Sequence, residues 1–220
     1  MLIQIMLVAH IAVLGYWLGS ELVINSTYRR IALGSELPFS ERTRWMEHVM
    51  NVDQHVRYAL ALQAGLGFML ADQLGYIPGG RAGSWTVAGL TGVWLAFIEL
   101  THRIRGRAAG QWLGKLDRAT RYGVISVLLM IGVRLVGRGW EMPGWLRVKL
   151  LLFGAVVACG VAIRLVLLRH FRVWSVMAKH GPTAQADALV RQTYVQGTLI
   201  LVALWTLITS IVVVSIWKPA

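Results

Sequence analysis

Long apolar runs alternate with short polar, basic segments along this chain. Six runs stand out, and they cover residues 2–26, 56–74, 84–101, 121–137, 145–168 and 192–217. A helix needs about 20 apolar residues to cross about 30 Å of hydrocarbon. The third and fourth runs are shorter, so flanking residues or helix tilt would complete them. The pattern predicts an all-α integral membrane protein, a six-helix transmembrane bundle that forms a single domain over residues 1–220.

Basic residues are concentrated on alternate connections between the runs. The connections after the first, third and fifth runs carry most of them, namely Arg29, Arg30, Arg42 and Arg44, then Arg103, Arg105, Arg107, Lys115 and Arg118, and finally Arg169, Arg172, Lys179 and Arg191. Positive charge is retained on the cytoplasmic side of a membrane, so residues 27–55, 102–120 and 169–191 are predicted to lie inside. Both termini are then expected outside, in a multi-pass protein of a bacterial inner (cytoplasmic) membrane.

The composition limits the classes of partner. Hydrophobic residues make up 56% of the chain, and the formal net charge is +12. This charge fits membrane topology and contact with anionic lipid. Nucleic-acid binding would need a folded basic module, and no connection is long enough to form one. The single cysteine, Cys159, excludes an intramolecular disulfide and a Cys-x-x-Cys motif for zinc or attached haem. We therefore expect membrane lipid, and not nucleic acid, as a partner.

A short motif occurs twice in the same register. Asp-x-x-x-Arg-Tyr enters the second run at Asp53–Tyr58 and the fourth run at Asp117–Tyr122. Asp at position i and Arg at i+4 lie on one face of a helix, so each copy is predicted to hold an exposed structural ion pair worth about 0.3–0.5 kcal/mol at the inner interface. The repeat suggests a duplicated helical hairpin, with ordinary interface chemistry as the alternative.

Three polar residues are predicted to lie in the outer half of the membrane. They are His10 in the first run, Arg134 in the fourth and Lys149 in the fifth. A neutral imidazole can ligate haem iron, and two cations could pair with the propionates of a porphyrin. The alternative for His10 is a hydrogen bond to a neighbouring helix, and the two cations could instead reach the outer surface. The other histidines are predicted to be interfacial, namely His48, His55, His102, His170 and His180.

Short patches resemble the HemJ-type protoporphyrinogen oxidases, whose wider superfamily includes CopD-like copper-resistance membrane proteins. One patch reads His10-Ile-Ala-Val-Leu-Gly-Tyr-Trp17-Leu-Gly19 and is similar to that family's first helix. A second reads Trp145-Leu-Arg-Val-Lys149-Leu-Leu-Leu, and a third is the hydrophobic end Ile-Trp-Lys218-Pro219. The family's Tyr-Leu-Pro-Arg segment is absent. The resemblance implies a helical membrane protein that binds haem b, with His10 as the iron ligand and Lys149 beside the porphyrin.

The leading hypothesis is a haem b-binding inner-membrane protein with a role in redox chemistry or porphyrin oxidation. In that hypothesis His10 is the metal ligand, and His10, Arg134 and Lys149 bind the cofactor. If the chain is a protoporphyrinogen oxidase-like oxidoreductase, Lys149 is the candidate catalytic residue, and a porphyrin and a quinone are expected partners. One alternative is a non-catalytic subunit of a larger respiratory or photosynthetic complex, or a homo-oligomer. The other is a CopD-like copper-handling permease, which the lack of Met-x-x-Met and Met-x-Met patterns disfavours.

Overall fold

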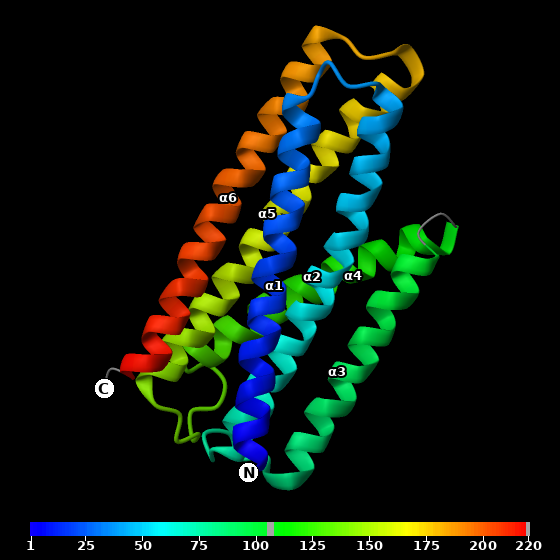
Figure 1. The fold of residues 1–220 in the computed structure, drawn as a ribbon. Coiled ribbons are helices and arrows are strands. Elements are labelled where there is room, and N and C mark those ends of the chain that lie inside the picture. The colour runs from blue at the N-terminus through cyan, green and yellow to red at the C-terminus, as the bar shows by residue number, and fades with distance from the viewer. Residues whose placement is uncertain (105–107, 219–220) are drawn as a thin grey trace.

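The computed structural model describes residues 1–104 and 108–218, and these residues form helices and connections without a β-strand. The helices are α1 (Leu2–Leu33), α2 (Phe39–Gln73), α3 (Gly80–Arg103), α4 (Ala108–Gly132), α5 (Gly144–His180) and α6 (Ala184–Trp217). The predicted all-α class and the predicted order of six helices are confirmed. Both termini lie at the same end of the molecule (Figure 1). Arg105 and Arg107 of the second basic connection lie outside the described residues, as does the side chain of Lys115.

Four of the helices are long and apolar enough to cross a membrane by length and composition. They are α1, α3, α5 and α6. Helix α2 is not in this group, and its apolar stretch is interrupted by the polar residues Gln63, Asp72 and Gln73. Helix α4 is not in it either, and its apolar stretch is shorter than the sequence suggested. The structure is therefore a helical protein with four candidate membrane spans and two further helices packed beside them.

The fourth helix ends earlier than predicted. The apolar run to residue 137 predicted a helix of that extent, but α4 ends at Gly132. Arg134 then adopts a φ of 64°, and Gly137 a φ of 71°. A left-handed residue just after a helix terminates it and turns the chain away. Apolar content alone does not show this backbone turn, so residues 133–137 were wrongly assigned to the helix.

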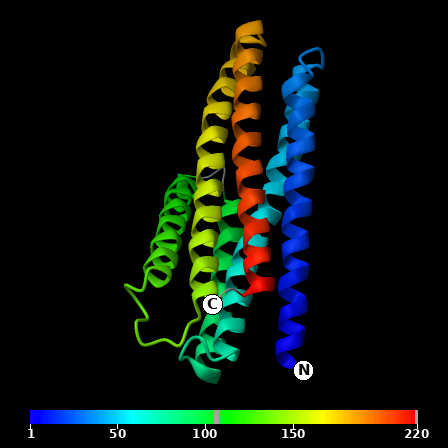
Figure 2. The ribbon, with the colours of Figure 1, turned by 90° about the vertical axis from the view of Figure 1, so that its left-hand side faces the viewer.

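Helices also fill most of two segments that were predicted to be inner connections. Helix α1 continues to Leu33 and α2 begins at Phe39, while α5 continues to His180 and α6 begins at Ala184. Helices of 32 to 37 residues are about 48–55 Å long at 1.5 Å per residue, well above about 30 Å of hydrocarbon. Helices α1, α2, α5 and α6 therefore project past the neighbouring ends of α3 and α4, as Figures 1 and 2 show.

This projecting part, residues 27–33, 39–52, 169–180 and 184–194, is called the four-helix extension below. It has its own hydrophobic core, formed by Tyr28, Ile31, Ala32, Met46, Val49, Trp174, Met177, Ala186 and Val190. These residues recur at helical spacing, so one face of each helix is apolar while the other faces carry most of the basic residues; Arg42 is the exception, at 1% exposed. Burial of these apolar faces explains why the basic segments are helical and not extended loops.

Packing places the helices in a fixed order around the bundle. Helix α1 packs on α2 and less extensively on α6, α6 packs on α5, α5 packs on α4, and α3 packs mainly on α2. A second core, shared by five helices, consists of Trp17, Ala59, Leu60, Leu128, Val156, Val157, Leu204 and Ile208. Helix α3 lies close to α2 at Gly65, where an added Cβ would be 2.2 Å from Thr91 Oγ1. The bundle interior is therefore bounded by α1, α2, α4, α5 and α6.

Candidate functional site

The first polar site in the bundle interior surrounds His10, and we call it the outer site. The Nε2 atom of Gln63 in α2 lies 3.0 Å from the Nε2 atom of the His10 ring. Gly67, one turn further along α2, also faces the ring, since a Cβ added there would lie 3.4 Å from Cε1. This is the interhelical hydrogen bond that stood as the alternative to haem ligation.

That hydrogen bond leaves polar atoms of the outer site without a partner. His10 Nδ1 and Gln63 Oε1 are both buried and have no hydrogen-bond partner among the described residues. Buried polar atoms nearly always have a partner, so two open atoms on neighbouring side chains offer a place for water, an ion or a ligand to bind. With Gln63 Nε2 as the donor, the neutral ring carries its proton on Nδ1; with the Gln63 amide turned by 180°, His10 Nε2–H donates to Oε1 and the Nδ1 lone pair is free to bind a metal. An open ring nitrogen fits one axial ligand of haem iron.

Lys149 of α5 belongs to the same site. It is half-buried, and its charge acts on the His10 ring. Helix α1 packs on α2 and α6, so this effect acts across the bundle interior and not along a shared helix interface. Two of the three residues that the sequence singled out are therefore within electrostatic reach of each other.

Arg134 lies elsewhere. It follows the end of α4, its side chain is exposed, and its charged neighbour is Arg147. Arg147 is buried and donates hydrogen bonds to the carbonyl oxygens of Ile131 at 3.2 Å and Met142 at 3.3 Å. Arg147 therefore stabilises the α4–α5 connection through these hydrogen bonds. Arg134 lies on the exposed side of the same connection.

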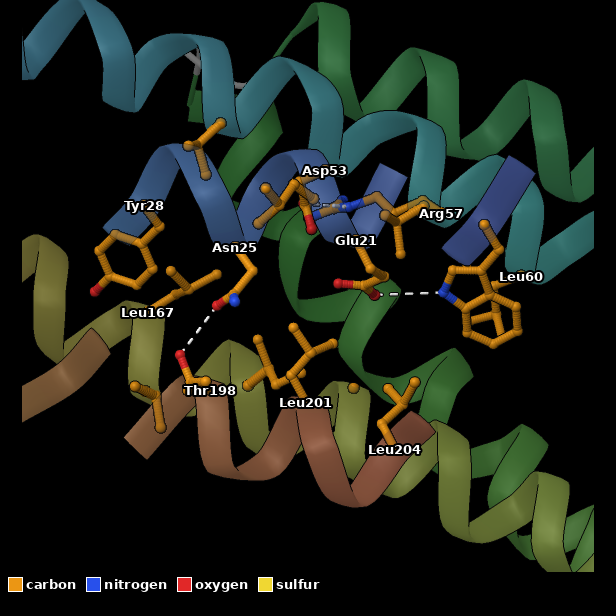
Figure 3. Close-up of a pocket in the computed structure, with 18 of the residues that line it drawn as sticks. Glu21, Asn25, Tyr28, Asp53, Arg57, Leu60, Leu167, Thr198, Leu201 and Leu204 are labelled. Atoms are coloured by element: carbon orange, nitrogen blue, oxygen red, sulfur yellow. Dashed lines mark hydrogen bonds and ion pairs between the residues drawn. The ribbon is translucent and has the colours of Figure 1, made fainter. Parts of the chain in front are cut away.

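A second polar site lies deeper in the bundle, at a cavity of about 90 Å³ (Figure 3). Its polar residues come from four helices and are Glu21, Asn25, Asp53, Arg57, Arg121 and Thr198, while the rest of the lining is mainly apolar. Trp17 Nε1 donates a hydrogen bond to Glu21 Oε1 at 3.3 Å. Thr198 Oγ1 donates to Asn25 Oδ1 at 3.0 Å. We call this the central cavity.

One wall of the central cavity is an ionic cluster formed by both copies of the repeated motif. Arg57 Nε lies 3.1 Å from Asp53 Oδ2, and Arg57 Nη1 lies 3.8 Å from Asp117 Oδ2. Arg121 Nη2 lies 3.4 Å from the same Asp117 oxygen. Arg121 and Arg164 also act on the charge of Asp53. Arg57 therefore joins the two copies, which the sequence did not predict.

The cluster is also buried, contrary to the prediction of exposed pairs. Arg57 is 6% exposed and Asp117 is 8% exposed. Helices α2 and α4 both bring their motif to the bundle interior, where the neighbouring helices cover it. The prediction of two separate surface pairs was wrong because a sequence motif does not show which helices lie side by side.

A third polar group lies in the core of the four-helix extension. His170 is fully buried, so its predicted place at the interface was wrong. Tyr28 Oη lies 2.8 Å from its Nδ1 atom, and its ring stacks on Trp174 with centroids 5.0 Å apart. The Arg42 guanidinium lies over the Trp174 ring, with its Cζ atom 5.4 Å from the ring centroid. Arg42 also forms a salt bridge with Asp187, with Nη1 2.7 Å from Oδ1. These contacts join all four helices of the extension.

Comparison with known proteins adds no family to this description. No family model, curated protein or solved structure matches the chain. Among the residues that the structure describes, no three His, Cys, Asp or Glu side chains are grouped to hold a metal ion. The resemblance to HemJ-type oxidases therefore remains a prediction.

Proposed function

We propose that this chain is a six-span protein of a bacterial inner membrane that binds haem b at the outer site and serves redox chemistry or porphyrin oxidation. The observation that carries the proposal is the pair of buried, unpartnered atoms, His10 Nδ1 and Gln63 Oε1, with the charge of Lys149 acting on the His10 ring. Polar groups inside a membrane bundle usually face a cofactor, a substrate or one another. Here two helices supply the open polar atoms and a third supplies the cation.

Each residue of the outer site has a role in this proposal. His10 would supply an axial nitrogen to iron, and Lys149 would pair with a propionate through a charge-assisted hydrogen bond. Gly67 allows the imidazole to pack closely on α2, because a Cβ at this position would lie 3.4 Å from Cε1. Haem in such a site supplies one-electron chemistry. If a porphyrinogen is the substrate, Lys149 is the candidate catalytic residue because it would hold a substrate carboxylate.

The spectrum of the purified protein tests this proposal. We expect the dithionite-reduced protein to show a Soret band and an α band of the b type, in a stoichiometric amount. A colourless protein that is pure and folded would contradict haem binding. That outcome would favour the alternative of a non-catalytic subunit of a larger membrane complex.

The proposed orientation has a separate test, based on single cysteines in a Cys159→Ala background. Ser35 lies in the exposed α1–α2 turn, and Glu141 lies in the exposed α4–α5 connection at the opposite end of the bundle. The excess of Lys and Arg near the α1–α2 turn places it inside. In intact cells, Glu141→Cys should react with a membrane-impermeant maleimide, and Ser35→Cys should react only after lysis. The reverse pattern would invert the orientation and place His10 in the inner half.

The two motif copies also support the proposed duplication of a helical hairpin. Both copies lie within an outward-running helix in this orientation, and Arg57 bridges from the first copy to Asp117 of the second. Repeated hairpins in membrane proteins often form a shared polar site between them. The ionic cluster occupies such a position.

A further inference from the structure

Glu21 is the acidic residue of the central cavity that lies apart from the ionic cluster's salt bridges. It is 7% exposed, and Figure 3 shows its carboxylate among the cavity side chains, opposite Leu201 and Leu204. One carboxylate oxygen accepts the Trp17 indole hydrogen bond. The salt bridges of the cluster use the carboxylates of Asp53 and Asp117. An indole N–H offsets much less of the cost of a buried charge than a guanidinium does.

Charged residues from three other helices line the central cavity or belong to the ionic cluster at its wall. Helix α2 supplies Asp53 and Arg57, α4 supplies Asp117 and Arg121, and α5 supplies Arg164. The charge that acts most directly on Glu21 is the like charge of Asp53. Helix α6 contributes uncharged residues to the described cavity lining, among them Thr198. When all these side chains are ionised, the three arginines and the three acids, Glu21 included, sum to zero, so a protonated Glu21 leaves the group with one positive charge.

The central cavity gives the Glu21 carboxylate access to water, which can lower the cost of its buried charge. A cavity of about 90 Å³ can hold several waters, since one water needs roughly 10–15 Å³. Water beside a carboxylate can deliver a proton to it and accept one from it. Protonation removes the buried charge, while Asp53 and Asp117 keep their arginine partners.

We propose that Glu21 is a proton-binding site that exchanges protons with water in the central cavity. In the step, a hydronium ion transfers a proton to a carboxylate oxygen, one O–H bond breaks and one forms, and a water molecule remains. No electron is transferred, and the charge of the cavity rises by one. Buried ionisable residues within a helical bundle are typical of proton pathways.

This site is distinct from the outer site, although both lie on one face of α1. His10 and Glu21 are 11 residues apart, which is about three helical turns or roughly 16 Å. The proton-binding proposal therefore does not depend on haem. Its test can be made on protein that contains no cofactor.

Infrared difference spectroscopy between acidic and alkaline buffer tests the proposal directly. We expect the protein in lipid to show the C=O stretch of a buried protonated carboxyl group that disappears on deprotonation. Glu21→Gln should remove this band, because an amide does not bind the proton. The matched control is Glu141→Gln, which changes an exposed glutamate and should retain the band. A band that persists in Glu21→Gln, or no such band in the unaltered chain, would overturn the proposal.

Trp17→Phe provides a second test that keeps the carboxyl group. It removes the indole donor at 3.3 Å while preserving an aromatic side chain in the core. Loss of a hydrogen bond raises the frequency of a carboxyl C=O stretch. We therefore expect the band to shift to higher frequency without disappearing. An unshifted band would assign the proton to another carboxyl group, even if Glu21→Gln did not fold.

Discussion

Arg57→Ala is expected to destabilise the protein by about 3–5 kcal/mol, because removal of one partner leaves buried carboxylates uncompensated. Arg57 is 6% exposed and contacts Asp53 at 3.1 Å and Asp117 at 3.8 Å. Its loss leaves the bridge between α2 and α4 without its cation. Reversible unfolding in mixed detergent micelles, monitored by circular dichroism, measures the change in the free energy of unfolding.

The matched control is Arg103→Ala, which removes an arginine from an ion pair of the same i, i+4 spacing. The Arg103 side chain is 74% exposed, and its partner Glu99 lies on the same helix. Solvent screens such a pair, so little or no shift of the unfolding midpoint is expected. Equal effects of the two substitutions would show that the cluster around Arg57 is as well solvated as a surface pair.

The number and order of the helices could be predicted because each apolar run is bounded by polar residues. The residues at which the helices begin and end could not be predicted in the same way. Arg42 and His170 belong to segments whose basic residues suggested connections, yet both side chains are buried between helices. A segment that buries a narrow apolar face but carries many basic residues has little net hydropathy. Its helical periodicity was the available signal, and it is visible in Tyr28, Ile31 and Ala32.

For the candidate sites, single residues could be predicted from the sequence, but the contacts between helices could not. His10 and Lys149 could be found because polar residues within apolar runs are rare. Gln63 was missed although it also interrupts an apolar run, and the same signal would have revealed it. The repeated motif was found, but its burial depends on the contact of α2 with α4 through Arg57 and Asp117. Such a contact between distant segments depends on helix order in the membrane plane, which one sequence does not show.

If the proposed site holds haem, His10→Ala is expected to abolish the haem spectrum or shift it strongly, because it would remove the proposed nitrogen ligand of the iron. The matched control is His48→Ala, since His48 is an exposed histidine of the four-helix extension. That variant should keep the spectrum of the unaltered protein. Absorbance of the reduced protein per mole of polypeptide, with circular dichroism as the check on folding, is the measurement.

Lys149→Ala separates the role of the cation from that of the iron ligand. A partner of a propionate contributes less than an iron bond, so this variant should retain part of the haem. Lys149→Arg should restore the charge but not the full occupancy, because a planar guanidinium does not replace a compact ammonium. An unaltered spectrum in His10→Ala would instead remove His10 from the site. His170 would then be the first residue to replace, because its Nε2 atom is buried and has no partner among the described residues.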